Sequence, residues 1–338
     1  MDALSRLLRE RDWLMADGAT GTNLFNAGLT AGEAPELWNL ERPAAIIALH
    51  ESFVAAGSDV ILTNSFGGTA ARLRLHGAEG RVREINRRAA ELARAVADRA
   101  GRPVVVAGSM GPTGELLAPL GPLDPEAASA MFEEQARGLI EGGADVLWIE
   151  TISAEDELRA AAAAAARLGA PFCATLSFDT AGRTMMGVSS ADWGRIAADL
   201  PAAPLAVGAN CGVGAADLVR TVLGLSAAAP GAAIVAKANA GVPHFHDGAI
   251  RYDGTPEVMA DYARLARDAG ARIVGGCCGT RPEHLRAMRA ALEAHVPGPR
   301  PTLEEVAARL GGFSSTTDGV TGGDAPVSRH ERRGRRRV

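Results

Sequence analysis

Eight short apolar runs divide the chain, and a stretch with helical spacing follows each of them. The runs are continuous rather than alternating, which is typical of strands buried on both faces of a parallel sheet. They cover residues 13–18, 58–64, 103–109, 144–150, 171–178, 203–210, 232–239 and 271–276. An eightfold strand–helix alternation predicts a (β/α)8 TIM barrel, which we expect to form a single domain over residues 1–311.

A doubly wound open sheet is the alternative architecture for the same alternation. It would carry a glycine-rich phosphate-binding fingerprint in its first strand-to-helix turn. The turn that follows the first apolar run reads DGATGTN, which does not match G-x-G-x-x-G. The sequence therefore favours the closed barrel.

The chain changes character after residue 311. Residues 312–338 are rich in glycine, serine and arginine and show no apolar periodicity. We therefore predict a disordered basic tail over this segment. A contact between its end, RHERRGRRRV, and an acidic partner is the alternative to a simply solvated segment, which composition favours.

Composition excludes several classes of protein. The formal net charge is -5, which argues against nucleic acid as a partner. No run of 18 or more apolar residues is present, so we expect no membrane span. The first residues lack the features of a secretory signal, and we expect a cytoplasmic protein. In a reducing compartment, the four cysteines are better suited to a metal or to catalysis than to disulfides.

Polar residues stand at the carboxyl ends of the predicted strands, where the active site of a (β/α)8 barrel lies. They are Asp17, Asn64, Ser109, Glu150, Asp179 (or Phe178 before it), Asn210, Cys211, Asn239, Cys277 and Cys278. Three of the four cysteines belong to this set. Cys173 instead lies inside the fifth run, where we expect a small buried apolar residue.

The three strand-end cysteines form a candidate metal site. Cys211, Cys277 and Cys278 should meet at one mouth of the barrel, because the sixth and eighth strands flank the seventh. Three thiolates fill three corners of a zinc tetrahedron and leave the fourth open, as in a catalytic site. Two buried thiols are the alternative for the adjacent pair, and a purely structural metal is the alternative for the whole set.

Adjacent cysteines need a sharp turn if both sulfur atoms are to face one ion. A disulfide between neighbours is strained, whereas Gly275, Gly276 and Gly279 would allow the turn. Zinc with three thiolates is a poor activator of water, but it can hold an incoming thiol as a thiolate near neutral pH. The pattern therefore predicts attack of a thiol sulfur on an electrophilic carbon.

Seven sequence blocks carry a family resemblance. They are DGATGTNL at Asp17, AGSDVILTNSFGGT at Ala56, AGSMGPTG at Ala107, GGADVLWIET at Gly142, GANCGVG at Gly208, KANAGVP at Lys237 and GGCCGTRPEH at Gly275. With them, residues 12–295 resemble the homocysteine S-methyltransferase family, which includes betaine–homocysteine methyltransferases and the homocysteine domain of cobalamin-dependent methionine synthase. The resemblance implies the same barrel and methyl transfer to homocysteine, which forms methionine.

The resemblance also implies a metal. It assigns a catalytic zinc ion to Cys211, Cys277 and Cys278. Asn239 matches a residue whose side-chain oxygen can take the fourth zinc position when homocysteine is absent.

The same resemblance assigns the substrate contacts. Asp17 and Glu150 are expected to bind the amino group of homocysteine, where two carboxylates can face one ammonium. The alternative for each is a carboxylate that caps the following helix. From the shape of the turn, Gly18, Gly21 and Thr22 are candidates to present amides to the substrate carboxylate.

The methyl donor stays open at this point. Trp38 matches a tryptophan of the aromatic cage that binds betaine, but the cage tyrosines have their equivalents here at Gly67 and Thr151. Other segments are more similar to the methionine synthase domain, so we expect methylcobalamin on a separate protein, or betaine. S-methylmethionine is a third donor. A non-catalytic subunit that presents homocysteine within a larger assembly is the alternative to an enzyme.

Overall fold

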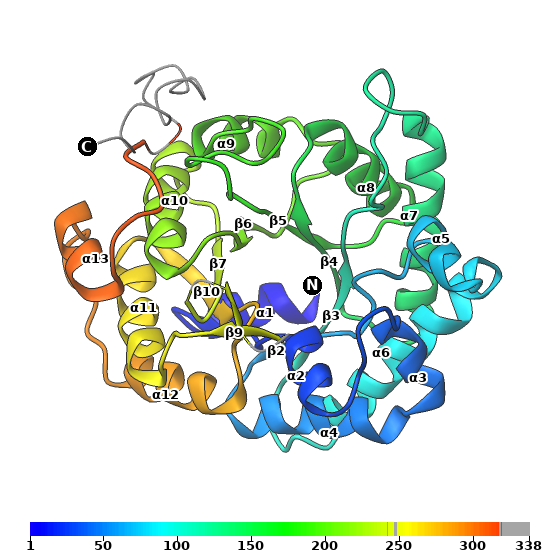
Figure 1. Ribbon diagram of the computed structural model, residues 1–338, viewed down its shortest axis with the longest axis horizontal. Helices are drawn as coiled ribbons and strands as arrows, with labels where there is room; N and C mark the ends of the chain where they lie inside the picture. The colour runs from blue at the N-terminus through cyan, green and yellow to red at the C-terminus, as the bar shows by residue number, and fades with distance from the viewer. Residues whose placement is uncertain (242, 247–248, 318, 320–338) are drawn as a thin grey trace, which may run out of the picture.

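The eight apolar runs form eight parallel strands of one sheet, as the computed structural model shows (Figure 1). The structure describes residues 1–241, 243–246, 249–317 and 319. Along the sheet the strands follow the order β1-β10-β7-β6-β5-β4-β3-β2. The strands are β1 (Leu14–Met15), β2 (Val60–Leu62), β3 (Val105–Met110), β4 (Val146–Ile152), β5 (Phe172–Leu176), β6 (Ala206–Cys211), β7 (Ile234–Ala238) and β10 (Ala271–Gly276). The predicted (β/α)8 barrel is confirmed.

Helices surround the sheet on its outer side, except α1, which lies across one end of the barrel (Figure 1). They are α1 (Ala3–Glu10), α2 (Thr20–Asn26), α3 (Trp38–Glu41), α4 (Pro43–Ala55), α5 (Ala70–Leu73), α6 (Val82–Asp98), α7 (Pro125–Glu141), α8 (Glu155–Arg167), α9 (Ser190–Ala198), α10 (Ala215–Ala228), α11 (Pro256–Asp268), α12 (Pro282–Glu293) and α13 (Leu303–Leu310). Short 3-10 turns lie at Pro35–Leu37, Arg74–His76 and Glu79–Arg81. Within the described residues, no helix has the length and apolar character needed to cross a membrane.

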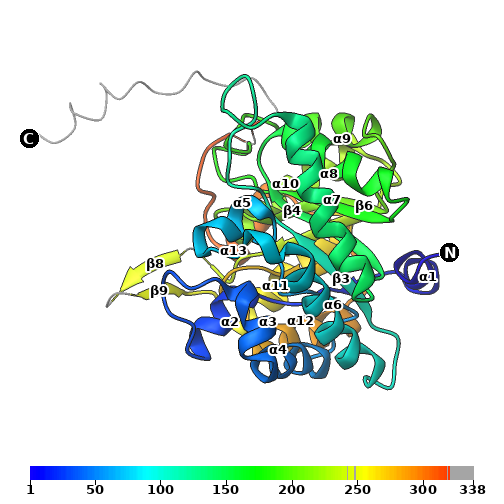
Figure 2. The ribbon, with the colours of Figure 1, turned by 90° about the vertical axis from the view of Figure 1, so that its right-hand side faces the viewer.

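The two ends of the barrel are closed differently. At the end where the strands begin, α1 buries Leu4, Leu7 and Leu8 against residues of the barrel interior. At the opposite end, a hairpin of β8 (Pro243–His246) and β9 (Ala249–Tyr252) extends from the barrel (Figure 2). The apolar pattern did not predict this hairpin, because its two strands pair only with each other and belong to no run of the barrel.

The seam between the first two strands is short. β1 pairs with β10 through two residues, and it meets β2 only at the bridge between Ala16 and Val60. Asp59 reinforces this seam from the start of β2. Its backbone N–H donates to the carbonyl of Met15 at 2.6 Å, and its carboxylate accepts the N–H of Met15 at 2.9 Å. Asp59 therefore adds two hydrogen bonds to a junction that has little strand pairing of its own.

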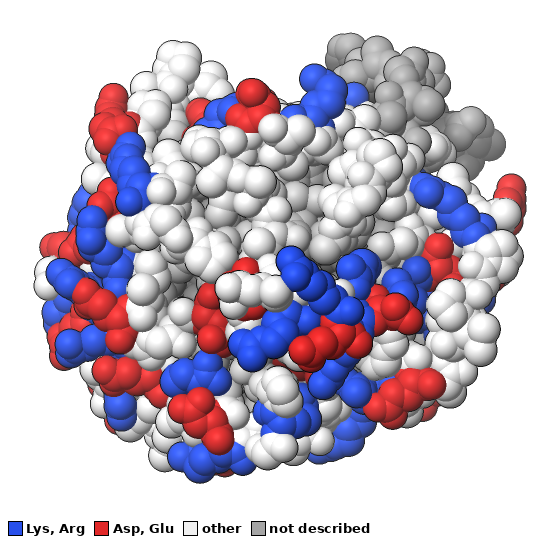
Figure 3. Space-filling model, turned by 180° about the vertical axis from the view of Figure 1, so that it is seen from behind, with Lys and Arg blue, Asp and Glu red and all other residues white. Residues whose placement is uncertain are grey.

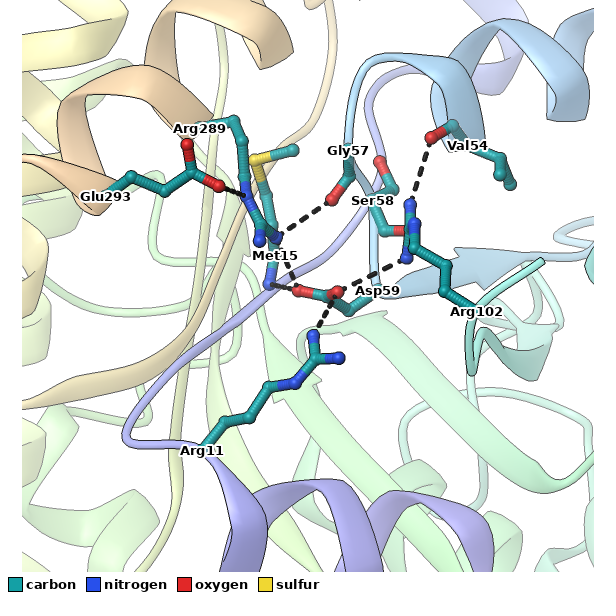
Figure 4. Close-up of polar contacts among 9 residues, drawn as sticks. All are labelled: Arg11, Met15, Val54, Gly57, Ser58, Asp59, Arg102, Arg289 and Glu293. Atoms are coloured by element: carbon teal, nitrogen blue, oxygen red, sulfur yellow. Dashed lines mark hydrogen bonds and ion pairs between the residues drawn. The ribbon is translucent and has the colours of Figure 1, made fainter. Parts of the chain in front are cut away.

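Three guanidinium groups surround the carboxylate of Asp59 (Figure 4). Arg11, Arg289 and Arg102 lie 2.7, 3.0 and 3.4 Å from it, and its side chain is 1% exposed. They come from the residue after α1, from α12 and from the segment before β3. On the face seen in Figure 3, which carries α1, basic and acidic side chains lie next to one another. The aspartate thus ties three distant segments to the weakest part of the sheet.

The segment after α13 returns to the barrel. Phe313 packs under the guanidinium of Arg220, whose side chain also donates to the carbonyl of Ser315 at 2.9 Å. The N–H of Ser314 donates to Asp217, also on α10, at 2.9 Å. Residues 320–338, most of the predicted disordered tail, lie outside the described residues, so the tail and its boundary stay predictions.

Candidate metal and substrate site

A cavity of about 250 Å³ opens among the carboxyl ends of the strands. The barrel places it there because parallel strands direct all their carboxyl ends to one side. Residues that the sequence singled out line this cavity, among them Gly18, Gly21, Thr22, Asn64, Ser109, Glu150, Cys211, Cys277 and Cys278. Asp17, Trp38 and Asn239 are not among its lining residues.

The three cysteines meet as predicted. Their sulfur atoms all lie within 4.8 Å of one another, and those of Cys211 and Cys278 are 3.9 Å apart. Two sulfur atoms at the corners of a zinc tetrahedron, each about 2.3 Å from the ion, would be about 3.8 Å apart. Cys211 ends β6, whereas Cys277 and Cys278 follow β10, and β7 separates the two strands. Cys173 is buried in β5, as expected.

Backbone geometry directs these sulfur atoms into one space. Cys211 has φ 61° and Gly279 has φ 78°, both in the left-handed region that disfavours most side chains. Gly275 and Gly276 do not have positive φ, so they do not make the expected turn. They serve close packing instead, because a Cβ at Gly276 would lie 2.2 Å from the side chain of Thr280.

Without a cation the thiols keep their protons. The pKa of Cys211 reaches about 12: its contact with Cys277 lowers the pKa, but its contact with Cys278 and burial raise it more. The contact with Cys211 raises the pKa of Cys277, and burial adds to this effect. A divalent cation would reverse this preference, since only thiolates bind it well.

Asn239 carries an unpaired side-chain oxygen. The side-chain nitrogen of Asn239 donates to the carbonyl of Gly212 at 2.8 Å, whereas its oxygen Oδ1 is buried without a partner. The amide also lies within hydrogen-bonding reach of Cys211. A buried acceptor without a donor is costly, and a metal ion would relieve that cost. The three sulfur atoms fit a zinc ion.

With Glu36, Glu150 is one of the two glutamates in the lining of this cavity. It accepts a hydrogen bond from the hydroxyl of Ser109 at 2.5 Å and is 8% exposed. Burial raises the pKa of Glu150, although the nearby charge of Lys237 opposes that shift. The pairing of β4 with β5 shifts register between Ile149 and Ile152, so the strand bulges at Glu150. Such a bulge re-aims a side chain, here into the cavity.

Asp17 lies behind a lysine. The ammonium of Lys237 donates to Oδ1 of Asp17 at 2.7 Å, and the N–H of Leu62 donates to Oδ2 at 2.7 Å. Asp17 is fully buried, whereas Lys237 lines the cavity. Burial lowers the pKa of Lys237, but the charges of Asp17 and Glu150 raise it more, so this lysine is charged.

Sequence reasoning missed Lys237. It is the only lysine in the chain, and it stands inside the apolar run 232–239. A charged residue within a strand buried on both faces is rarely found without a partner. That anomaly could have identified Lys237 as a member of the site.

The turn after β1 forms another part of the wall. Gly18, Gly21 and Thr22 line the cavity. The hydroxyl of Thr22 accepts the N–H of Gly279 at 3.2 Å, which ties α2 to the cysteine loop. At Gly18 a Cβ would lie 2.8 Å from the carbonyl oxygen of Thr280, so the close approach requires glycine.

The equivalents of the betaine cage are arranged differently. Trp38 is 2% exposed, and the guanidinium of Arg42 lies 4.4 Å from its ring centroid. Glu36 accepts the N–H of Gly67 at 2.6 Å, and a Cβ at Gly67 would lie 2.9 Å from the same oxygen. Phe66 is the one aromatic residue in the lining of this cavity. The described wall does not form an aromatic cage.

Comparison with known proteins gives one consistent result. The family model described as "Homocysteine S-methyltransferase" matches residues 14–292. The methionine synthase of Mycobacterium tuberculosis is 32% identical over 299 residues, and that of Mycobacterium leprae is 30% identical over 295 residues. Each match covers 82% of this chain and 24% of the relative, so the chain spans about a quarter of their length.

A solved structure is similar over nearly its whole length. The metallated form of the homocysteine methyltransferase MmuM from Escherichia coli matches with a TM-score of 0.72 and 26% identity. The match covers 86% of this chain and 99% of that chain.

Proposed function

Because the chain belongs to the homocysteine S-methyltransferase family, we propose that it transfers a methyl group to the sulfur of homocysteine and forms methionine. The observation that carries this proposal is the meeting of Cys211, Cys277 and Cys278 at the wall of a cavity that Glu150 also lines. The three sulfur atoms would hold a zinc ion, with Oδ1 of Asn239 as the ligand that substrate replaces.

When bound, a zinc ion would supply an open position that accepts the homocysteine sulfur as a thiolate. The chain's own residues place the rest of the amino acid. Glu150 would bind the ammonium group through a charge-assisted hydrogen bond, and the turn at Gly18 and Thr22 would face the carboxylate. The sulfur lone pair then forms the new bond to the methyl carbon, and the donor leaves with the electron pair of the broken bond. No side chain needs to act as a general base if the thiol proton is lost on binding.

The charged side chains of the site suit an ammonium group. Lys237 is paired with Asp17 at 2.7 Å, whereas the carboxylate of Glu150 lines the cavity and is free to take a substrate ammonium. In this proposal Glu150 contacts the substrate ammonium directly. Asp17 acts indirectly, through its ion pair with Lys237.

Methylcobalamin on a separate protein is the donor that we favour over betaine. A quaternary ammonium calls for an aromatic cage, and the buried Trp38 already has Arg42 on its ring. S-methylmethionine, a sulfonium, remains the third donor to test. A reducing compartment such as the cytoplasm would keep the three thiols available for metal.

A non-catalytic subunit that presents homocysteine is the second candidate. The chain spans 24% of the methionine synthases that it matches, which supports this candidate. Its match to 99% of MmuM supports a barrel that acts alone. Purified protein loaded with zinc, given homocysteine and each of the three donors in parallel, separates the two. Methionine formed with any donor supports the enzyme, whereas zinc and homocysteine binding without turnover supports the subunit.

A further inference from the structure

Asn210 connects the substrate side of the site with the metal side. This residue lies next to the end of β6 and is fully buried. Its Oδ1 accepts the N–H of Thr151 at 2.9 Å and the hydroxyl of Thr175 at 2.6 Å. Its Nδ2 donates to the hydroxyl of Thr151 at 2.7 Å and lies 3.8 Å from the sulfur of Cys277. All four hydrogen-bonding positions of this amide are therefore occupied.

The orientation of the amide is unambiguous. A backbone N–H can only donate, so the atom that faces the N–H of Thr151 must be the oxygen of Asn210. The other atom is then the NH₂ group, and one of its hydrogens faces Cys277. A longer distance is normal when sulfur is the acceptor.

The same amide holds a strained turn. Thr151 has φ 62°, which is a genuine outlier for a β-branched residue, and it directly follows Glu150. Two of the four bonds of Asn210 go to Thr151. The strain persists because the surroundings over-determine it, and these two bonds supply that restraint. They also set the direction in which Glu150 leaves the strand.

We propose that Asn210 is a positioning residue that couples the two halves of the site: it fixes the Glu150–Thr151 turn and donates an N–H to the sulfur of Cys277. This inference rests on the proposed function, because it treats Cys277 as a metal-bound thiolate. A hydrogen bond to a ligating thiolate withdraws electron density from sulfur and fixes its direction. Such outer partners typically contribute 10- to 100-fold to metal affinity.

Asn210→Ala and Thr175→Val form the matched test. The alanine variant removes the donor to sulfur and both restraints on Thr151. The valine variant removes one bond to the same amide, keeps the shape of the side chain and leaves the donor in place. Both changes should lower the melting temperature. Only Asn210→Ala should lower zinc affinity, by about 10- to 100-fold in competition with a chelator.

Two further measurements separate positioning from structure. In the cobalt-substituted protein, Asn210→Ala should shift the sulfur-to-cobalt charge-transfer band to lower energy, because the thiolate becomes richer in electrons. Where activity is measurable, the KM for homocysteine should rise more than kcat falls, since Glu150 loses its restraint. Thr175→Val should leave the band and the KM unchanged.

The outcomes that overturn the inference are distinct. A folded Asn210→Ala protein with wild-type zinc affinity and an unshifted band would reduce Asn210 to a structural role, with the proposed function intact. If the variant does not fold, wild-type protein loaded with an NMR-active cadmium isotope decides. One asparagine side-chain proton must then show a scalar coupling to cadmium, and its absence refutes the hydrogen bond. Wild-type protein that binds no zinc overturns the proposed function itself.

Discussion

Lys237 donates to Oδ1 of Asp17 at 2.7 Å across the barrel interior, with both side chains almost fully buried. The family resemblance assigned Asp17 to the amino group of the substrate, yet in this structure an ammonium of the chain itself occupies that carboxylate. Lys237 also lies close enough to Glu150 for its positive charge to favour the ionised form of that carboxylate. The pair thus links the stability of the barrel with the charge of the cavity.

Replacing Lys237 by Met should destabilise the protein by about 3–5 kcal/mol, because it leaves the charge of Asp17 buried and unpaired. The double variant Lys237→Met/Asp17→Asn should recover part of this loss, since neither charge then remains. Urea unfolding of the two single variants and the double variant measures the coupling. Strictly additive losses would show that the two side chains do not interact.

Cys278→Ala should lower zinc affinity by more than the roughly 100-fold that loss of an outer partner can cost, because it removes a direct ligand. Cys173→Ala is the matched control, since that thiol is buried in β5 away from the cluster. Competition with a chelator reports the affinity of each variant. Equal zinc affinities in the two variants would exclude Cys278 from the metal site, whereas a lower melting temperature with unchanged thiol binding would indicate a purely structural metal.

Glu150→Gln should raise the KM for homocysteine by about 10- to 100-fold, in line with the loss of a hydrogen bond between charged groups. An analogue without the amino group should bind both proteins equally well. Glu157→Gln is the control, because that carboxylate is also buried but contacts Thr113 at 2.6 Å and does not line the cavity. A loss of affinity for the analogue in Glu150→Gln would point to a general disturbance of the site.

Asp59→Asn should lower the free energy of unfolding by roughly 2–3 kcal/mol, because three arginines would then surround a neutral amide. The loss is smaller than the 3–5 kcal/mol of a fully buried pair, since the guanidinium side chains are 26–34% exposed. Glu141→Gln, which breaks the exposed pair with Arg83, should leave the free energy of unfolding almost unchanged. Urea denaturation compares the two, and similar values would mean that Asp59 does not hold the seam.

Acidification should destabilise the protein through His50 on α4. Both ring nitrogens are buried without a partner, and burial lowers the pKa of His50 to about 4. In the unfolded chain the imidazole of His50 has a pKa of about 6.5, so it binds a proton at pH values where the buried imidazole stays neutral. The free energy of unfolding therefore falls as the pH drops from about 6.5 to about 4. The total loss approaches about 3 kcal/mol at pH 4. In His50→Leu this part of the pH dependence should disappear, and an unchanged pH profile of urea unfolding would contradict it.

The barrel and the cysteine cluster follow from local pattern. Strands buried on both faces appear as continuous apolar runs, and parallel strands direct their carboxyl ends to one side. Cys211 and Cys277 therefore had to approach each other once the sixth and eighth runs became neighbours of the seventh. No contact between particular side chains was needed for that prediction.

The contacts between side chains in the site depend on closure of the barrel. Whether Lys237 reaches Asp17, whether Asn210 faces Cys277, and whether Trp38 turns toward the core are set by strand register and side-chain direction. The contacts join residues that lie far apart in sequence. Asp17 and Lys237, for example, are 220 positions apart. The sequence by itself determined which residue types stand at the strand ends, because hydrophobic burial is a local pattern. Only the tertiary structure decided which of them are paired, because pairing depends on distances that close only when all eight strands meet.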